Sequence, residues 1–543
     1  MGTIIPNIRD FLLTRHEIQY FRPDYLFKKN VLLMNAQRIL LLLLFLLPNI
    51  LLTAQIDYKI LDQYLAKAQQ DWDIPGMAIG IIENGEVKLA KGYGHLKSGT
   101  ETTVDGNSIF AIASNTKAFI SAAIGILVDE GKLKWDDPVQ QYLPYFELYA
   151  PYVSANITVR DLLCHRAGLG TFSGDVIWYK SNYSAEEVVK RAAKVPQDYG
   201  FRSGYGYSNL MFITAGEVIE AVSGQPWHEF IKKHIFQPLD MARTRTSVED
   251  LKKMTNVAQP HKPTDGKNRP IPYVNWDNMG AAGGILSSVN DMLKWVQLQI
   301  DGGKTGDQQI FSARAQETFW QPHNNFRVSS GTKEYFPTRH VSGYALGWSY
   351  FDHGGQMVYN HGGGYDGMYS KVVVVPEAKL GIVILTNSMK GISNPLTYHI
   401  LDQAFNLEPK DWNKQGLEGE ERGAAFRKKR IDDRIASRLP DTKPTLELPA
   451  YAGKYSDDMF GTIEVNHTEK GLELHFPSAP SLDATLEHWH LNTFEIKWKE
   501  VHAWFDFGTL QFVLDNNGKV QSLQFDVPND DIFFEEIHAK RTE

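Results

Sequence analysis

The sequence predicts an α+β protein in which an antiparallel sheet is flanked by helices and carries a mainly helical lobe. Two hairpins predict the sheet. In residues 75–94 an Asn84-Gly85 turn joins two β-rich runs, and residues 365–387 contain a second pair of buried strands. Helical patterns fill most of the chain between them, so the sheet must be assembled from distant segments.

A separate all-β domain is predicted at the end of the chain. Residues 447–543 hold short alternating strands at regular spacing with turn residues between them, which indicates a small sandwich or barrel. Residues 406–446 are highly charged and broken by glycine and proline. We interpret them as a solvated, helical linker in preference to a binding patch.

The first 54 residues do not have the pattern of a folded domain. Arg38 precedes an apolar run at 39–47, and small residues follow, which is the pattern of a signal peptide. Met34 begins a better-formed signal than Met1, so we expect an overlong start followed by cleavage near Gln55. The run is shorter than the roughly 20 residues that a membrane helix needs, although an uncleaved anchor is the alternative. We therefore expect a periplasmic or secreted protein with no stable membrane span after signal removal.

Composition narrows the classes of function. Of the 543 residues, 22% are charged and 43% hydrophobic, and the net charge of -8 comes with no basic tract, so no nucleic-acid partner is expected. Cys164 is the only cysteine, which excludes an internal disulfide and a cysteine-based metal site. His488 and His490 share one strand face, and His361 is a further possible ligand, but no third ligand accompanies them. We expect no metal and no cofactor.

Ser114 and Lys117 form the most informative motif. They precede an apolar run at 118–128 that predicts a buried helix, and residues three apart share a helix face. A serine hydroxyl needs a proton acceptor to become a nucleophile, and a partly desolvated lysine can serve. The alternative is a helix cap beside a solvated lysine. A second Ser-x-x-Lys, Ser330 to Lys333, lies in a polar run that predicts a loop without catalytic chemistry.

Two further motifs lie where such a nucleophile would need help. Tyr207 and Asn209 occur in a glycine-rich loop before a helix expected at 212–222, where they offer a phenol and an amide. The alternative for Tyr207 is ordinary loop packing. His361 and three glycines precede the second hairpin, and glycines allow close approach of a backbone to a ligand. The run also matches G-x-G-x-x-G, but no strand–turn–helix unit surrounds it.

These three motifs, in this order, resemble those of the penicillin-recognising serine hydrolases. The branch is that of class C β-lactamases, D-alanyl-D-alanine carboxypeptidases, D-aminopeptidases and related esterases, and the resemblance covers residues 56–405, a β-lactamase-like domain. Residues 447–543 look like the lipocalin-like domain of some members.

The resemblance implies a role for each matching residue. Ser114 would be acylated, Lys117 and Tyr207 would share the proton transfers, and Asn209 would hold the substrate's amide. The backbone N–H groups of Ser114 and Gly364 would form the oxyanion hole, with Gly363 beside the substrate. His361 stands where many β-lactamases have a lysine, which weakens a role in antibiotic resistance.

The predicted function is an exported serine hydrolase that cleaves amide or ester bonds of small substrates through an acyl-enzyme on Ser114. D-amino-acid substrates and short peptides are included. A true β-lactamase and a non-catalytic penicillin-binding sensor are the alternatives. The sequence leaves the oligomeric state open, as well as the choice between Lys117 and Tyr207 as general base.

Overall fold

The computed structural model describes residues 56–264 and 266–542, and Gln55–Glu543 form one compact unit. The predicted signal peptide lies outside the described residues. Within them, eight strands form an antiparallel sheet, in which the first and second hairpins of the chain are neighbours, as predicted. In sheet order the strands are β2 (Glu86–Gly94), β1 (Gly76–Glu83), β14 (Leu380–Thr386), β13 (Met368–Val375), β12 (Gln356–Tyr365), β11 (Ser349–His353), β10 (Ser342–Tyr344) and β9 (Asn324–Asn325).

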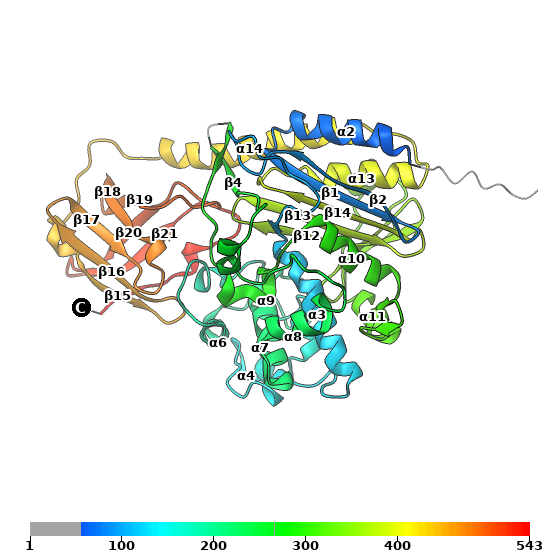
Figure 1. Ribbon diagram of the computed structural model, residues 1–543. Helices are drawn as coiled ribbons and strands as arrows, with labels where there is room; N and C mark the ends of the chain where they lie inside the picture. Colours follow the sequence, from blue (N-terminus) through cyan, green and yellow to red (C-terminus); the bar gives the residue numbers. More distant parts are fainter. Residues whose placement is uncertain (1–55, 265, 543) are drawn as a thin grey trace, which may run out of the picture. The chain divides into compact units, whose positions relative to one another are not determined.

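Helices cover both faces of this sheet (Figure 1). One face carries α2 (Tyr58–Asp71) and α13 (Ser393–Ala404), and α14 (Trp412–Ala436) packs on α13. The other face is contacted by α10 (Val289–Ile300). Because both faces are covered, every residue of β14 is buried, which explains its unbroken apolar sequence.

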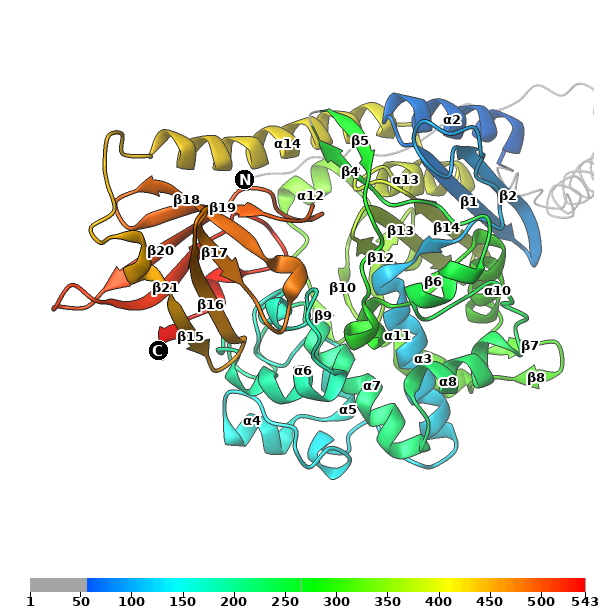
Figure 2. The same cartoon turned by 60° about the vertical axis from the view of Figure 1, so that its left-hand side comes forward.

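The helical lobe is built around α3 (Thr116–Asp129), which packs against α7 (Asn209–Ser223), α8 (Trp227–Ile231), α9 (Gly280–Gly283) and α11 (Ala313–Trp320). Figure 2 labels α3 with α7, α8 and α11, and Figure 1 labels α9. All residues of α3 from Thr116 to Leu127 are buried, as the apolar run predicts. The lobe consists of α4 (Pro151–Asn156), α5 (Val159–Leu162), α6 (Ala185–Arg191), α7 (Asn209–Ser223), α8 (Trp227–Ile231), α9 (Gly280–Gly283) and α11 (Ala313–Trp320).

Two local predictions were wrong. Ser330 lies at the start of a short helix, α12 (Ser330–Tyr335), which Ser329 caps by accepting a hydrogen bond from the Thr332 backbone. Ser330 and Lys333 are nevertheless both exposed. Helix α7 starts at Asn209 and not at residue 212, so Asn209 belongs to the first turn of the helix.

Eight strands at the end of the described chain close into a barrel, which resolves the predicted choice between sandwich and barrel. Its alternating apolar residues point inward, as Ile463 and Val465 do on β16. The likeness to lipocalins stays a prediction. The strands are β15 (Gly453–Asp457), β16 (Gly461–Thr468), β17 (Gly471–His475), β18 (Ala484–His490), β19 (Thr493–Trp498), β20 (Thr509–Leu514), β21 (Val520–Asp526) and β22 (Lys540–Arg541).

Helix α14 occupies most of the segment predicted as a linker. Only Trp412 of its described residues is buried, so the helix is largely solvated. Arg430 pairs with Asp530 at 2.7 Å, and Arg434 pairs with Asp526 at 2.8 Å, so the helix is fastened to the barrel. The domain boundaries stay predictions.

The barrel also contacts the helical lobe directly. Tyr183 donates a hydrogen bond to the Phe460 carbonyl at 2.7 Å, and the Asn182 backbone donates to the Ser478 carbonyl at 2.7 Å. Lys262, on β4 (His261–Thr264), pairs with Asp506 at 2.7 Å. These contacts hold one rim of the barrel against the lobe that carries Ser114.

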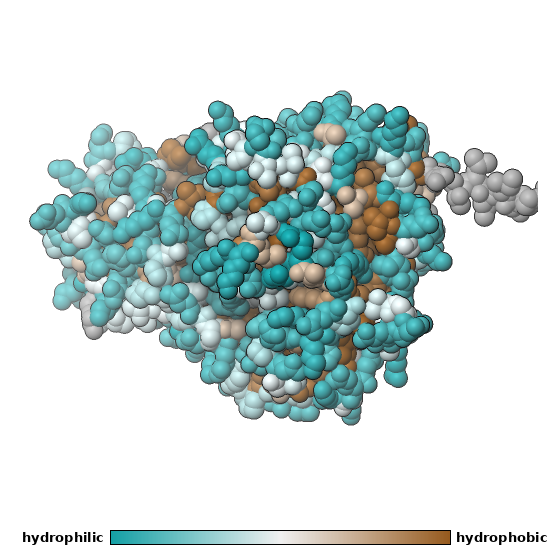
Figure 3. Space-filling view, viewed as in Figure 1, coloured by the Kyte–Doolittle hydropathy of each residue, from teal (hydrophilic) through white to brown (hydrophobic). Residues whose placement is uncertain are grey.

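The surface is mostly hydrophilic on the face shown in Figure 3, with smaller hydrophobic areas between. Across residues 56–264 and 266–542, no helix combines the length and apolarity that a membrane crossing requires.

Candidate active site

Ser114 lies in a tight turn between β3 (Phe110–Ala111) and α3, in the single 3-10 turn Ala113–Asn115. Ala113 has a φ of 46°, a left-handed conformation that is strained for a residue with a side chain. The turn is held from the sheet, because Ser370 on β13 donates a hydrogen bond to the Ile112 carbonyl at 2.7 Å. Of the described residues from Ser108 to Leu127, only Ser114 is partly exposed. The Ser114 hydroxyl is therefore accessible to a ligand, while its neighbours in this stretch are buried.

Lys117 lies one helical turn further on and is fully buried. Its Nζ is 3.1 Å from Ser114 Oγ, 2.7 Å from Asn209 Oδ1 and 2.8 Å from the Ala282 carbonyl oxygen. Burial lowers the pKa of Lys117 to about 7, against a smaller opposing effect of Asp175. The predicted meeting of hydroxyl and amine is thus present, and near neutral pH much of the amine carries no proton.

Asn209 links this pair to a buried acid that the sequence did not single out. Because its Oδ1 accepts from Lys117, its Nδ2 faces Asp175 and donates to Asp175 Oδ2 at 2.7 Å. The second Nδ2 hydrogen is left for a ligand. Asp175 follows Gly174, whose φ is 80°, in a 3-10 turn of residues Asp175–Ile177.

Tyr207 places its ring beside the amine, with Lys117 Nζ 4.8 Å from the ring centroid. His165 lies against Tyr207 at 4.2 Å between ring centroids and accepts a hydrogen bond from the Ser208 backbone at 3.0 Å. Burial raises the pKa of Tyr207 well above 10, although its contact with Ser114 acts in the opposite direction. The phenol therefore keeps its proton at neutral pH.

His361 lies within β12, whereas the sequence had placed it before the hairpin. Nδ1 is 2.6 Å from the Gly362 carbonyl, which can only accept, so Nδ1 carries the proton and Nε2 accepts from the Tyr344 hydroxyl at 2.9 Å. Burial lowers the pKa of His361 to about 3, with a smaller effect of Lys117. The ring is neutral.

The strand is open beside His361. β11 pairs with β12 only up to Asn360, so residues 361–365 pair with β13 alone. Gly364 lines the cavity above Ser114. Gly363 faces the other way, because a Cβ there would lie 2.2 Å from the Ile112 carbonyl oxygen. The glycine thus lets β12 approach the nucleophile turn, and a direct substrate contact stays a prediction.

A cavity of about 210 Å³ joins these groups. Its predicted members are Ser114, Tyr207, Asn209, His361 and Gly364, while Lys117 lies behind Ser114. Most of the others come from segments without a motif, namely Phe172, Asp175, Trp178, Trp276, Met279, Trp504, Asp531 and Ile532. The last three are from the barrel domain, so two domains build one site. No sequence motif pointed to these eight residues, and the only hint was that tryptophan and aspartate residues occur in the loops that carry some of them.

Comparison with known proteins assigns this chain to a family. Residues 61–405 match the Beta-lactamase family, and residues 437–541 match a family described only as a domain of unknown function, DUF3471. The chain belongs to the Beta-lactamase family. The predicted membership of the penicillin-recognising serine hydrolases is thereby confirmed.

Two kinds of curated relative are similar to this chain. The chain is 29% identical over 404 residues to "Unguisins hydrolase ungD'" of Aspergillus campestris, covering 71% of this chain and 73% of that protein. It is 26% identical over 355 residues to "Protein flp" of Staphylococcus aureus, covering 64% and 66%.

Solved structures show the same fold. The octameric penicillin-binding protein homologue from Pyrococcus abyssi has a TM-score of 0.59 at 22% identity, covering 90% of this chain and 100% of that one. EstCE1, described as a hydrolase with promiscuous acyltransferase activity, has a TM-score of 0.53 at 22% identity, covering 64% and 100%. The predicted β-lactamase-like α+β fold is confirmed.

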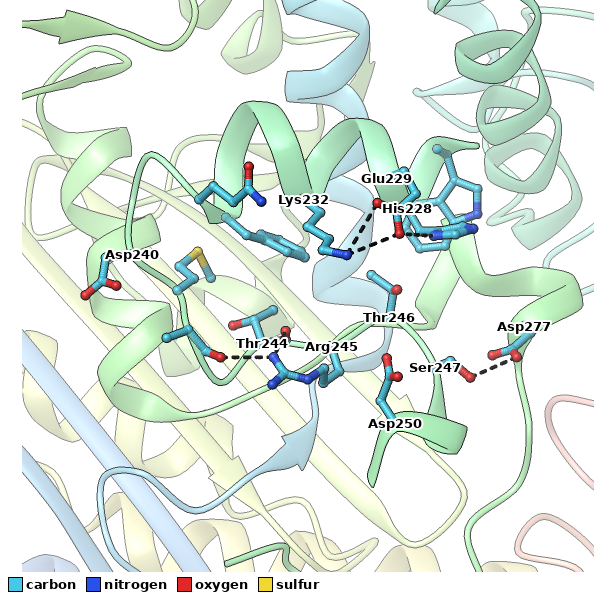
Figure 4. A pocket seen from close by; sticks show the side chains of 15 residues that line it. His228, Glu229, Lys232, Asp240, Thr244, Arg245, Thr246, Ser247, Asp250 and Asp277 are labelled. Atoms are coloured by element: carbon cyan, nitrogen blue, oxygen red, sulfur yellow. Dashed lines mark hydrogen bonds and ion pairs between the residues drawn. The ribbon is translucent and has the colours of Figure 1, made fainter. Parts of the chain in front are cut away.

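A wider hollow of about 880 Å³ lies elsewhere on this Beta-lactamase-family chain, around α8 (Figure 4). Lys232 pairs there with Glu229 at 3.3 Å, Arg245 donates to the backbone carbonyls of Ala242 and Thr244, and Ser247 donates to Asp277 at 2.9 Å. No serine–lysine pair like that of Ser114 is among its described lining residues. The smaller cavity is therefore the candidate active site.

Metal ligands are not clustered in the described chain, where no group of three or more histidine, cysteine, aspartate or glutamate side chains could hold an ion. His488 Nε2 instead lies 3.0 Å from the Leu491 carbonyl oxygen, and His490 Nδ1 accepts from the Leu439 backbone at 3.1 Å.

Proposed function

We propose that this protein is an exported serine hydrolase that cleaves amide or ester bonds of small substrates, D-amino-acid derivatives included, through an acyl-enzyme on Ser114. The observation that carries the proposal is the 3.1 Å approach of Lys117 Nζ to Ser114 Oγ inside a buried site. A hydrolase name among the relatives, that of the Aspergillus campestris protein, supports it.

Lys117 is suited to accept the Ser114 proton. A neutral amine has two hydrogens and one lone pair. Asn209 Oδ1 and the Ala282 carbonyl, both acceptors, take the two hydrogens at 2.7 and 2.8 Å. The lone pair then faces Ser114 Oγ, and a pKa of about 7 keeps much of the amine in this form. We therefore assign the general base to Lys117.

This geometry supports acylation of Ser114. As the proton passes to Lys117, Ser114 Oγ bonds to the substrate carbonyl carbon, and the carbonyl oxygen becomes an anion. The backbone N–H groups of Ser114 and Gly364 are the donors for that anion, and the N-terminal end of α3 adds a favourable partial positive charge. Gly364 has no side chain between the strand and the cavity that it lines.

Tyr207 is suited to the second proton transfer. Its phenol keeps its proton, because its pKa lies well above 10, and the ring lies beside the Lys117 amine. We assign it to pass its proton to the alcohol or amine that leaves as its bond to the carbonyl carbon breaks, and to receive a proton from the water that attacks the acyl-enzyme. Lys117 then returns its proton to Ser114 Oγ as the acyl bond breaks.

The alternatives differ in the fate of the acyl-enzyme. The test is incubation with a fluorescent penicillin and with a fluorophosphonate, followed over time on a gel, beside turnover of a neutral p-nitrophenyl ester. Ester turnover with slow or no release of the penicillin label supports the proposed hydrolase. Rapid turnover of the penicillin supports a β-lactamase. Permanent labelling by the penicillin without ester turnover supports a sensor.

Export is part of the proposal and has its own test. The signal pattern of residues 34–54 is its support. Mass spectrometry of the native protein is expected to find a mature chain beginning near Gln55. Intact residues 1–33 in that material would refute both the late start and the cleavage.

A further inference from the structure

The position of Tyr207 is not fixed by a helix or a strand. Helix α7 begins two residues later, at Asn209, and Tyr207 lies in irregular structure after a glycine-rich loop. The proposed proton transfers nevertheless require the phenol to stay beside Ser114 and Lys117, because a general acid acts only within hydrogen-bond reach. The groups that hold this stretch of backbone therefore determine whether Tyr207 can act.

One residue, His165, binds the backbone on both sides of Tyr207. Its carbonyl oxygen accepts a hydrogen bond from the Gly206 backbone at 3.2 Å, and its side-chain Nδ1 accepts from the Ser208 backbone at 3.0 Å. His165 is fully buried in the turn after α5, a neighbour of α7 in the lobe (Figure 2). Its φ of 59° is left-handed, a conformation that histidine adopts more readily than most residues. This turn directs both acceptors of His165 to the segment that carries Tyr207.

The imidazole of His165 also packs among the aromatic rings behind the site. Its centroid lies 4.2 Å from that of Tyr207 and 4.5 Å from that of Tyr344. The other rings around it are those of Phe212 and Tyr205, at 5.4 and 5.7 Å. The Tyr207 ring is therefore held through its side chain as well as through its backbone.

Packing alone does not account for a histidine at this position. Because Nδ1 accepts a hydrogen bond, Nε2 carries the proton, and this buried N–H has no hydrogen-bond partner among the described residues. An unsatisfied buried donor lowers stability, whereas a phenylalanine could pack among the same rings without that cost. What phenylalanine lacks is an acceptor for the Ser208 N–H. The hold on the segment around Tyr207 is thus the role that the imidazole explains.

The imidazole keeps this acceptor near neutral pH. Burial lowers the pKa of His165 well below 6.5, with smaller effects of Lys117 and His361. The ring is therefore uncharged where the enzyme is expected to work, and the lone pair on Nδ1 stays available to the Ser208 N–H.

We propose that His165 is a positioning residue, which binds the backbone on both sides of Tyr207 and so holds the phenol where it can protonate the leaving group. The phenol proton passes to the leaving oxygen or nitrogen as the bond to the carbonyl carbon breaks. This inference rests on the proposed function, which it deepens by naming the residue through which the fold places the general acid. His165 is not among the described residues that line the cavity, so it acts through Tyr207 and not on the substrate.

Two esters of the same acid separate positioning from a general loss of folded enzyme. p-Nitrophenolate leaves without a proton, whereas the alcohol of an ethyl ester must be protonated as it leaves. Because both esters form the same acyl-enzyme, the ratio of their kcat/KM values, ethyl over p-nitrophenyl, reports on protonation of the leaving group. A smaller folded fraction lowers both values by the same factor and leaves this ratio unchanged.

We expect His165→Phe to lower this ratio roughly 10-fold or more, a part of the 10²-fold or more that a general acid supplies. His165→Asn should keep it near the wild-type value, because its Oδ1 can replace the Nδ1 acceptor and asparagine also tolerates a positive φ. His353→Phe is the matched control. It removes another buried histidine, one that pairs with Asp402 at 2.7 Å, and should leave the ratio unchanged.

A double variant tests whether the effect passes through Tyr207. Once Tyr207→Phe has removed the phenol, adding His165→Phe should lower the ratio no further. An undiminished second loss in that background, or a wild-type ratio in His165→Phe, would overturn the positioning role while leaving the hydrolase intact. A wild-type enzyme that hydrolyses neither ester would refute the proposed function and this inference together.

The wild-type enzyme offers a readout that does not depend on the folding of His165→Phe. With ¹⁵N-labelled histidine, NMR should find the His165 ring neutral between about pH 6 and 8, with its proton on Nε2 and none on Nδ1. Its signals are those that His165→Asn lacks. A proton on Nδ1 would exclude the hydrogen bond from Ser208 and would overturn the inference.

Discussion

The amine of Lys117 lies 3.1 Å from the hydroxyl oxygen of Ser114, and burial lowers its pKa to about 7. The ordinary value of a lysine is about 10.4, at which almost no neutral amine exists at pH 7. The burial of α3 in the lobe thus converts a cation into a usable base. Both the pH dependence of the enzyme and its response to single substitutions should reflect this change.

The first prediction concerns pH. Because only the unprotonated Lys117 can accept the serine proton, kcat/KM for a neutral ester should rise as pH increases through about 7. The profile should be measured between about pH 6 and 9 after subtraction of spontaneous hydrolysis. An activity that is flat up to pH 8 and rises only near the ordinary lysine pKa would contradict this assignment.

The second concerns the proton relay. Lys117→Ala and Tyr207→Phe should each reduce kcat by roughly 10²-fold or more, because each removes a group that moves a proton. Lys333→Ala is the matched control, since that lysine is exposed in α12. Near-normal turnover in both active-site variants would exclude the relay.

The sequence predicted the site contacts that are local and missed most of those that form only on folding. Ser114 and Lys117 are neighbours on one helix, so local spacing was sufficient to bring them together. Tyr344 contacts His361, and Asp175 contacts Asn209, only because the folded chain brings distant segments together. Trp504 and Asp531 reach the cavity in the same way, from the barrel domain. No local pattern encodes those. The closure of the barrel likewise depends on strand pairing between β15 and β22, at opposite ends of its sequence.

The third prediction concerns His361. If the imidazole had its ordinary pKa of about 6.5, it would become protonated as pH falls and attract a substrate carboxylate. The preference for β-lactams over esters would then increase at low pH. The His361 pKa of about 3 instead keeps the ring neutral, held between Tyr344 and Gly362. The ratio of cephalosporin to ester hydrolysis should therefore show no change that follows an imidazole titration between about pH 6 and 8. A ratio that increases toward low pH and loses this trend in His361→Gln would show that the imidazole does titrate.

The fourth concerns the contribution of the barrel. Glu536→Gln replaces a charged acceptor by a neutral amide and so weakens the hydrogen bonds with Ser173 and Gly174, and the loop that carries Asp175 should shift. We expect KM for a small ester to rise several-fold, on the scale of a hydrogen bond to a charged group. Glu535→Gln is the control, because Glu535 accepts from Val527 within the barrel. Equal KM values for the two variants would mean that the barrel does not position this loop.

The most direct test of the proposed mechanism is the site of the covalent adduct. After brief reaction with a fluorophosphonate, peptide mass spectrometry should find the label on Ser114, with Ser114→Ala unlabelled and Ser330→Ala labelled normally. This is expected because Ser330 lies exposed in a short helix, whereas Ser114 has a buried lysine at 3.1 Å. A label on Ser330, or undiminished labelling of Ser114→Ala, would contradict the assignment of Ser114 as the nucleophile.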